Sequence, residues 1–187
     1  MKSIYVKWLL FALLGILVSL ANYLLAPIIA LFINKDGYLP KWLNWFQTPD
    51  NPAYGDKLFR HNQMNDSTND YWCGVVWATR NPGYGYDNTV GITVKEGFTA
   101  TTDTPEGLEW IGEWYDPMGS HINKVLKEGV MHRTLTQEGT TYFEWVLIRK
   151  WSATRYLKLK FGWALYQPFK VGEKRGLEFT ISPFMAI

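Results

Sequence analysis

Acidic and aromatic residues are mixed between positions 106 and 114, and they are the first candidates for chemistry. Glu106, Glu109 and Glu113 are three and four residues apart. Trp110 and Trp114 lie among them. On a helix this spacing would place the carboxylates on one face, and paired carboxylates beside aromatic rings can hydrolyse glycosides. Ordinary strands contain the same mixture, so a glycoside hydrolase is an alternative to a structural role.

Two histidines form a second candidate site. His121 and His132 are eleven residues apart, and Asp116 and Glu128 are close to them in the chain. Imidazole and carboxylate groups together can bind zinc or act as a general base. Isolated histidines are more often structural or exposed, so the pattern alone does not establish a site.

The other candidate residues are isolated. Cys73 is the only cysteine, which excludes an intrachain disulfide and favours a small buried side chain over a catalytic thiol. Asp50 and Asp56 lie in a stretch rich in proline, where acids cap turns more often than they bind metals. Arg80–Gly85 lacks the Lys-Ser/Thr pair of a phosphate-binding loop and predicts a turn. We therefore predict no catalytic, cofactor-binding or metal-binding residue.

A long uncharged segment near the N-terminus predicts where the protein is located. Trp8–Asn34 contains no charged residue over 27 positions. As a helix it would be about 40 Å long, and the hydrocarbon core of a bilayer is about 30 Å thick. A core helix of this length would be expected to have a polar face. The segment therefore predicts a transmembrane helix, with residues 1–34 as a membrane anchor.

Lysines and aromatic residues flank this segment at both ends. Lys2 and Lys7 precede it, and Lys35 and Lys41 follow it. Aromatic side chains at both ends are typical of the two membrane–water interfaces. We predict that six of them contact the interfaces of the lipid bilayer: Tyr5, Trp8, Tyr38, Trp42, Trp45 and Phe46.

Three alternatives concern the mode of anchoring. The apolar stretch exceeds the apolar region of a signal peptide and no A-x-A site follows it, which favours an uncleaved, single-pass anchor. Pro27 removes a helix hydrogen bond, so a re-entrant hairpin that turns between Asn22 and Pro27 is an alternative. Basic residues are nearly balanced across the segment. With the N-terminal amine, the positive-inside rule favours a cytoplasmic N-terminus and a periplasmic C-terminal domain.

The segment after the anchor predicts short helices. We expect residues 35–86 to form a juxtamembrane region of helices and loops. Pro40–Phe46 is typical of a short helix that begins with proline. Asp70–Arg80 has apolar residues at helical spacing, and Asn69 or Asp70 would cap its start. A buried strand fits the same letters and is the alternative for Asp70–Arg80.

Residues 87–187 predict a β-rich domain. Short runs of alternating or β-branched residues are separated by turn residues. In Arg155–Leu165, Leu157, Leu159 and Phe161 are expected to face the core, and Lys158 and Lys160 the solvent. The expected strands are Thr89–Lys95, Glu109–Tyr115, Gly129–Thr136, Thr141–Trp151, Arg155–Leu165 and Leu177–Ser182. The predicted fold class is α+β: one transmembrane helix, a short helical region and a mainly antiparallel β meander.

The charge distribution bears on the partners. The net charge is +2, so no global field favours nucleic acid. Residues 35–119 contain 6 basic and 12 acidic residues, and residues 120–187 contain 11 basic and 5 acidic residues. The two halves pair with each other within one fold, or the basic part meets an anionic partner or lipid headgroups.

Two sequence blocks resemble known proteins. Trp42–Asp56 reads WLNWFQTPDNPAYGD, and Trp77–Pro82 forms a W-x-x-R-N-P block. With the apolar N-terminus, residues 8–91 resemble uncharacterised small membrane proteins encoded by tailed bacteriophages. The resemblance implies a phage origin and no catalytic residue. We expect the protein in the host inner membrane. We expect a non-enzymatic interaction module that contacts a host-envelope or phage protein. A virion or assembly component and an envelope-active hydrolase are the alternatives.

Overall fold

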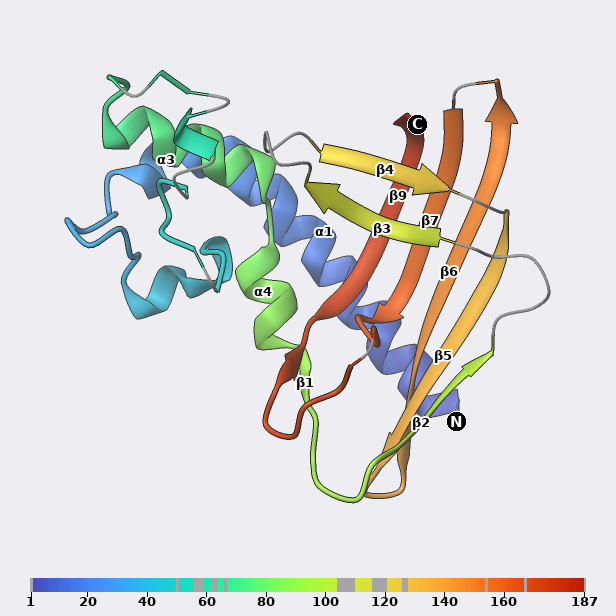
Figure 1. Cartoon of the computed structure of the whole chain (residues 1–187). Helices are drawn as coiled ribbons and strands as arrows, with labels where there is room; N and C mark the ends of the chain where they lie inside the picture. Colours follow the sequence, from blue (N-terminus) through green and yellow to red (C-terminus); the bar gives the residue numbers. More distant parts are fainter. Residues whose placement is uncertain are drawn as a thin grey trace. The chain divides into compact units, whose positions relative to one another are not determined.

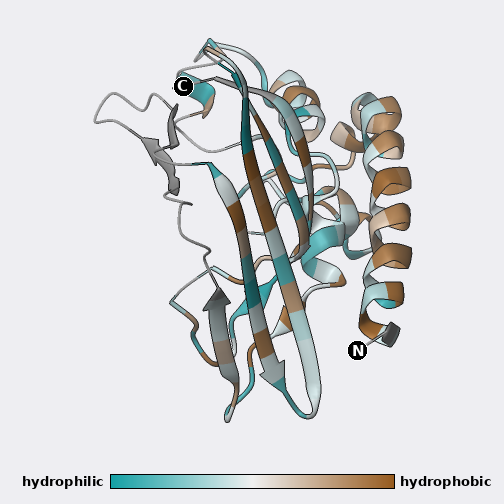
Figure 2. Cartoon of the chain, turned by 90° about the vertical axis from the view of Figure 1, so that its right-hand side faces the viewer, coloured by the Kyte–Doolittle hydropathy of each residue, from teal (hydrophilic) through white to brown (hydrophobic). Residues whose placement is uncertain are grey.

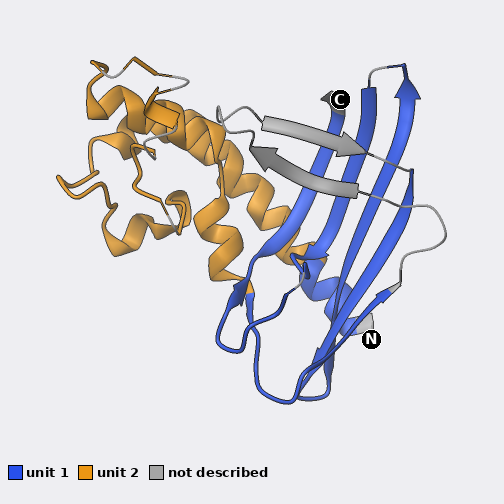
Figure 3. Cartoon of the chain, in the orientation of Figure 1, with its two compact units in different colours: residues 1–8, 92–187 blue, residues 9–91 orange. Residues whose placement is uncertain are grey.

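The computed structural model describes residues 2–49, 51–55, 59–61, 64–65, 67–103, 110–115, 121–125, 128–153, 155–166 and 168–186. The side chains at 2, 103, 110–115, 121–125 and 184–186 lie outside this description. By contacts the chain divides into two compact units, residues 1–8 with 92–187 and residues 9–91 (Figure 3). We call them the β unit and the helical unit. The three segments expected from the sequence, 1–34, 35–86 and 87–187, were defined by their expected roles. The contacts group the residues differently.

The predicted fold class is confirmed. The chain has one long apolar helix at the N-terminus, several short helices and an antiparallel sheet of five strands (Figure 1). The long helix, α1, spans Lys2–Ala30 without interruption, although Pro27 lies inside it. The re-entrant hairpin between Asn22 and Pro27 is therefore wrong. Pro27 has no backbone N–H to donate to the carbonyl of Tyr23, so α1 continues with one helix hydrogen bond missing.

The helical unit contains three further described elements. They are the 3₁₀ helix η1 (Lys41–Phe46), α3 (Asp70–Arg80) and α4 (Tyr84–Thr89). The side chain of Asn69 caps α3 by accepting a hydrogen bond of 3.0 Å from the backbone N–H of Trp72. This cap satisfies one of the free N–H groups of the first turn. The helix predicted at Asp70–Arg80 is thus confirmed over the strand.

The segment around Gly83 differs from the expectation. Arg80–Gly85 was predicted as a turn and Thr89 as the start of a strand, whereas α4 occupies Tyr84–Thr89. Gly83 has a φ of 80°, a left-handed conformation that glycine adopts without strain, and it begins this helix. The extended structure starts only at β1 (Ile92–Thr93). The six residues of α4 show no apolar periodicity, so the sequence did not predict a helix there.

The main sheet of the β unit is antiparallel, and its strands follow one another in chain order. The five-stranded sheet has the order β2-β5-β6-β7-β9, and all neighbours are antiparallel. Its strands are β2 (Thr99–Asp103), β5 (Gly129–Gln137), β6 (Thr140–Ser152), β7 (Arg155–Trp163) and β9 (Leu177–Ala186). Two small sheets pair β1 with β8 (Lys174–Arg175) and β3 (Trp110–Tyr115) with β4 (His121–Val125).

Tight turns hold the meander together. Glu138 and Gly139 connect β5 to β6 with φ values of 49° and 73°, as hairpin turns of two residues require. Ser152 pairs with Arg155 at the end of β6 and β7. The strand pair predicted from Thr141–Trp151 and Arg155–Leu165 is confirmed.

The lysines of β7 correct one expectation. Lys158 is opposite Ile148 and Lys160 is opposite Val146, so both belong to the face that carries the buried cluster of Met131, Val146, Ile148 and Tyr156. Lys158 is only 8% exposed, and its predicted contact with solvent is wrong. Lysine can bury its long aliphatic stem along apolar neighbours. Leu157, Leu159 and Phe161 occupy the opposite face and are half-buried.

Candidate functional site

The two sides of α1 differ in residue size and in exposure. The buried positions recur three or four residues apart and are mostly small: Ala12, Gly15, Val18, Asn22, Ala26, Ile29 and Ala30. We call this side the small-residue side. Small residues let neighbouring helices approach closely. The sequence analysis found no polar face on this segment, and size rather than polarity is the signal that it missed.

The segment of α3 and α4 packs against the small-residue side. The hydroxyl of Tyr86 donates a hydrogen bond of 2.9 Å to the backbone oxygen of Phe11. A Cβ atom added at Gly15 would lie 3.2 Å from the ring of Tyr86, so glycine makes room for this ring. Burial raises the pKa of Tyr86, with a further contribution from Asp87. The hydroxyl therefore stays a neutral donor.

Contacts farther along α1 show the direction of this packing. The side-chain nitrogen of Asn22, which is fully buried, donates to the backbone oxygen of Ala78 at 2.7 Å. A Cβ atom at Gly74 would meet the side chains of Ile33 and Ala30. As α1 proceeds from Phe11 to Ala30, its partners go back from Tyr86 to Gly74. The segment 74–86 therefore runs antiparallel to α1 over most of its length.

The other side of α1 is apolar and exposed, which Figure 2 shows in brown along the helix that starts at the N-terminus. We call it the leucine side. Its most exposed residue, Leu24, is 80% exposed. The residues of this side are Leu9, Leu10, Leu13, Leu14, Leu17, Leu20, Leu24, Leu25 and Ile28. Soluble monomers seldom expose an apolar patch larger than a few hundred Å², so a row of nine exposed apolar residues is unusual for them.

α1 satisfies the length and composition of a membrane-crossing helix over Ser3–Ala30, and these criteria alone also fit a signal sequence or a core helix. Within that helix, 28% of the most apolar window is buried. A core helix would be buried on most sides. In the part of the chain that the structure describes, most of α1 is exposed rather than buried.

Four of the six predicted interface residues lie in the helical unit. Trp42 is 70% exposed, and its ring packs edge-on against that of Phe32 at 5.3 Å. Tyr38 and Trp45 are also exposed. Phe46 is half-buried against a cluster formed by Ile29, Leu39, Leu43 and Ala53. Three of the four are thus available to a membrane interface, and Phe46 chiefly packs inside.

The other two lie in the β unit, where they pack on strands. The ring of Tyr5 stacks on Phe143 at 4.2 Å. Trp8 meets the rings of Phe143, Phe161 and Phe179 at 5.9 to 6.1 Å. Its indole N–H donates to the backbone oxygen of Glu178 at 3.3 Å. The first two turns of α1 are therefore a packing element of the sheet, which the sequence analysis missed.

Most of the residues proposed for chemistry fall outside the part of the chain that the structure describes. Glu106, Glu109 and Asp116 lie outside the described residues, as do Asp50 and Asp56, and the side chains of Glu113 and His121 are not described. Trp110–Tyr115 is a strand, so no helical stripe of carboxylates runs through it. His132 stacks on Trp145 at 4.0 Å. Among the residues that the structure describes, no three His, Cys, Asp or Glu side chains could hold one metal ion.

Cys73 and the buried charges have structural partners. The thiol of Cys73 is completely buried in α3, as expected for a small apolar side chain. Glu144 accepts hydrogen bonds from Arg133 at 2.9 Å and from the backbone N–H of Leu165 at 3.2 Å. Burial raises the pKa of Glu144, while Arg133 acts in the opposite direction. These groups connect neighbouring strands rather than line a cleft.

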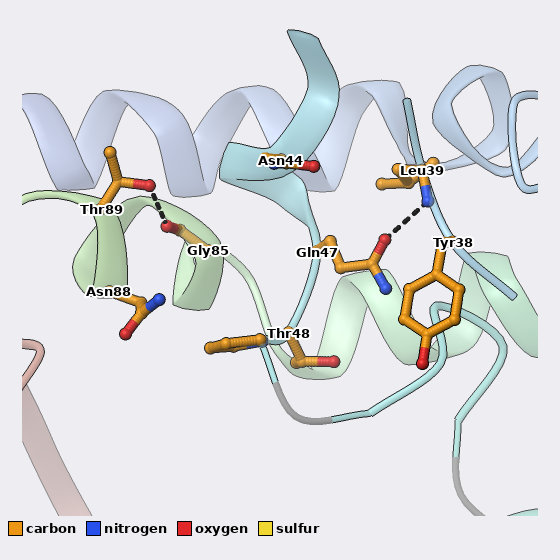
Figure 4. Close-up of a pocket in the computed structure, with 9 residues that line it drawn as sticks. Tyr38, Leu39, Asn44, Gln47, Thr48, Gly85, Asn88 and Thr89 are labelled. Carbon is orange, nitrogen blue, oxygen red and sulfur yellow. Dashed lines mark hydrogen bonds between the residues drawn. The ribbon is translucent and has the colours of Figure 1, made fainter. Parts of the chain in front are cut away.

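A cavity of about 320 Å³ lies in the helical unit (Figure 4). Gln47 lies in its wall, and its side chain is already engaged: its oxygen accepts from the backbone N–H of Leu39 at 2.6 Å. The lining residues are Tyr38, Leu39, Asn44, Gln47, Thr48, Pro49, Gly85, Asn88 and Thr89. None of these described residues carries a charge, so they offer no carboxylate ligand for a metal ion.

Comparison with known proteins identifies a family. Residues 1–187 match the model of a family of unknown function, DUF7338, and the chain belongs to that family. No curated protein and no solved structure matches the chain.

Proposed function

We propose that this DUF7338 protein is a membrane-anchored, non-enzymatic interaction module that tailed phages encode and that acts at the envelope of the host. The observation that carries the proposal is the leucine side of α1, which is exposed among the residues that the structure describes. Membrane lipid is the solvent in which such a surface is stable.

The energetics favour lipid contact. Burial of a single leucine side chain stabilises by about 1.5–3 kcal/mol relative to full exposure in water. Even half-exposed side chains would together contribute many times the thermal energy if they entered a bilayer. Lys7, Lys35 and Lys41 are exposed near the two ends of α1, where they can meet lipid phosphates. The apolar row and its basic ends support attachment to an anionic membrane such as a bacterial inner membrane.

The β unit supplies a surface for a partner protein. Trp151, Tyr166 and Ile181 are more than half exposed, and Trp145 is 39% exposed. Aromatic residues are enriched where proteins bind each other. A host-envelope protein or another phage protein is the partner that we propose for these side chains, whereas the net charge gives no support to nucleic acid. Phage origin rests on the resemblance of residues 8–91.

The topology expected from the charges is a single-pass anchor with residues 92–187 in the periplasm. That placement remains a proposal of the sequence. The packing of Tyr5 and Trp8 inside the β unit argues against this topology. It keeps the N-terminal end of α1 on the same side of a membrane as the strands it contacts.

Cell fractionation followed by affinity purification tests the proposed function. The full chain should sediment with inner membranes and enter the detergent phase on phase separation. Purification from infected cells in mild detergent should recover one specific partner, which a variant with Trp151→Ala and Ile181→Ala loses. A chain found in the soluble fraction would refute the anchor. Recovery in purified virions would instead favour the virion component.

A further inference from the structure

The packing along α1 carries an inference about how the helix meets the membrane, and this inference rests on the proposed anchoring. The small-residue side is covered by protein from Phe11 to Ala30. The leucine side is exposed over the same length. The covered side and the exposed side therefore both extend along the helix axis. A helix that crossed a bilayer alone would meet lipid on all sides along its length instead.

We infer that α1 lies along the membrane surface, with its leucine side buried in one leaflet of an anionic bilayer and the helical unit on the water side. In this arrangement the chain does not cross the membrane. Both termini and both units are then on the same side.

The polar content of the covering segment supports the in-plane arrangement. Gly83 approaches Ser19 and Ala78 approaches Asn22, so residues 79–82 lie level with the middle of α1. This stretch contains Arg80, which is exposed, and it leaves the helical conformation between α3 and α4. Charged side chains and non-helical backbone are costly inside the hydrocarbon region. A crossing α1 would carry both to mid-bilayer depth.

The water-facing side that α1 lacks is supplied by the rest of the helical unit. A helix that lies in the interface needs a polar side opposite its apolar side. α1 has no charged residue between Trp8 and Ala30, and for this reason its sequence predicts a span. The segment 74–87 covers its small-residue side instead, and it carries Asp87 near Gly15 and the exposed Arg80. The amphipathic surface is thus a property of the folded unit and is invisible in the helix alone.

The N-terminal end of α1 points to the same conclusion. Tyr5 and Trp8 pack on Phe143, Phe161 and Phe179 within the β unit. Residues 5–8 and residues 143–179 must therefore be on one side of any membrane. The predicted combination of a cytoplasmic N-terminus with a periplasmic C-terminal domain would separate them. The in-plane arrangement keeps this packing intact.

Labelling of single cysteines from the two sides of the membrane tests the inference. In a Cys73→Ala background of the full chain, Lys35→Cys places a thiol just after α1, and Glu96→Cys places one in the β unit. Both native residues are exposed. A membrane-impermeant maleimide is applied to right-side-out and inside-out vesicles of the inner membrane. We expect both thiols to react at least tenfold faster in the same vesicle preparation.

Reaction of the two thiols in opposite preparations would overturn the in-plane arrangement. It would leave the anchor itself in place, because the protein must be in the vesicles to be scored. Absence from the vesicles would refute the proposed function instead. Lys41→Cys replaces Lys35→Cys if the latter variant accumulates poorly, since Lys41 is also exposed.

Depth measurements provide a second readout. Leu10, Leu17 and Leu24 are seven residues apart and lie on the leucine side. With a fluorophore on a cysteine at each position, quenching by lipids brominated at known depths reports the depth of each site in phosphatidylethanolamine–phosphatidylglycerol vesicles. The in-plane helix predicts the same depth at all three. A gradient of about 10 Å from one position to the next, set by the helix rise, would show a crossing helix.

Discussion

The first two turns of α1 and the remainder of the same helix are stabilised in different ways. In Lys2–Trp8, large aromatic side chains pack on rings from three distant strands. In Leu9–Ala30, small residues pack against short helices and large residues stay exposed. The difference shows that one apolar helix has two roles. Its start completes a protein core, and its continuation divides into a protein-facing side and an exposed apolar side.

The largest effect is expected on the leucine side. Replacement of Leu10, Leu17 and Leu24 by Asp should move the protein from the membrane to the soluble fraction by more than tenfold. Each acid costs about 2.5–3.5 kcal/mol in an apolar membrane environment. Quantitative blotting of both fractions measures the change. The control is Ile181→Asp, an exposed position in the β unit, which should leave the distribution as it was. Unchanged membrane binding of the triple variant would contradict the lipid-facing role.

The next effect concerns the aromatic start of the helix. Trp8→Ala should destabilise the β unit by about 3 kcal/mol, near the lower end of the range for buried tryptophan, because Trp8 is half-buried and loses three ring contacts. Its membrane binding should persist. Urea unfolding followed by circular dichroism in mild detergent measures this stability. Val6→Ala is the matched control, since Val6 is exposed in the same turns. Equal stability of both variants would show that the first turns do not support the sheet.

A smaller effect is expected on the small-residue side. Gly15→Leu forces a side chain toward the ring of Tyr86, and overpacking of this kind costs about 1–3 kcal/mol. The neighbouring Ile16→Leu, on an exposed position, should have almost no effect. Comparison of thermal unfolding midpoints separates the two variants. If Gly15→Leu were as stable as Ile16→Leu, close packing of α4 on α1 would be refuted.

The smallest effect is a dependence on pH within the sheet. Burial raises the pKa of Glu144 above its ordinary value of 4.5. The folded state therefore holds this proton more tightly than the unfolded state does. The stabilisation is complete below the ordinary pKa and is lost as the pH rises through the raised value. Glu144→Gln should flatten this part of the stability profile. A wild-type profile that instead gains stability from Glu144 over this interval would contradict the assigned direction.

Local patterns predicted much of the fold. The uncharged run of α1, the Asn69 cap of α3 and the alternation of β6 and β7 each depend on residues close in the chain, and the structure contains all three. Long-range packing could not be predicted in this way. Trp8 has partners more than 130 residues away, and its sequence context is equally typical of a membrane interface. Lys158 was expected at the surface because its buried neighbours come from other strands.

In the candidate site, too, local features could be predicted and long-range packing could not. The exposure of Tyr38, Trp42 and Trp45 could be predicted, because these residues come shortly after the apolar segment. The small-residue side is present in the letters as Ala, Gly, Asn and Ala at helical spacing. Its meaning depends on a segment 74–86 that folds back along it. Residue size along a uniformly apolar helix is the signal that distinguishes a helix packed on one side from a helix surrounded by lipid.

The most direct test of the two-sided helix is a scan of nitroxide labels along α1 in vesicles, with accessibility to molecular oxygen measured at each position. Oxygen concentrates in lipid, so lipid-facing positions collide with it most often. We predict high accessibility at Leu10, Leu17 and Leu24 and low accessibility at Ala12, Asn22 and Ala26, with the helical period between them. Uniformly high accessibility at all six positions would contradict the account, because it would show α1 surrounded by lipid. Uniformly low accessibility would show a helix enclosed in protein.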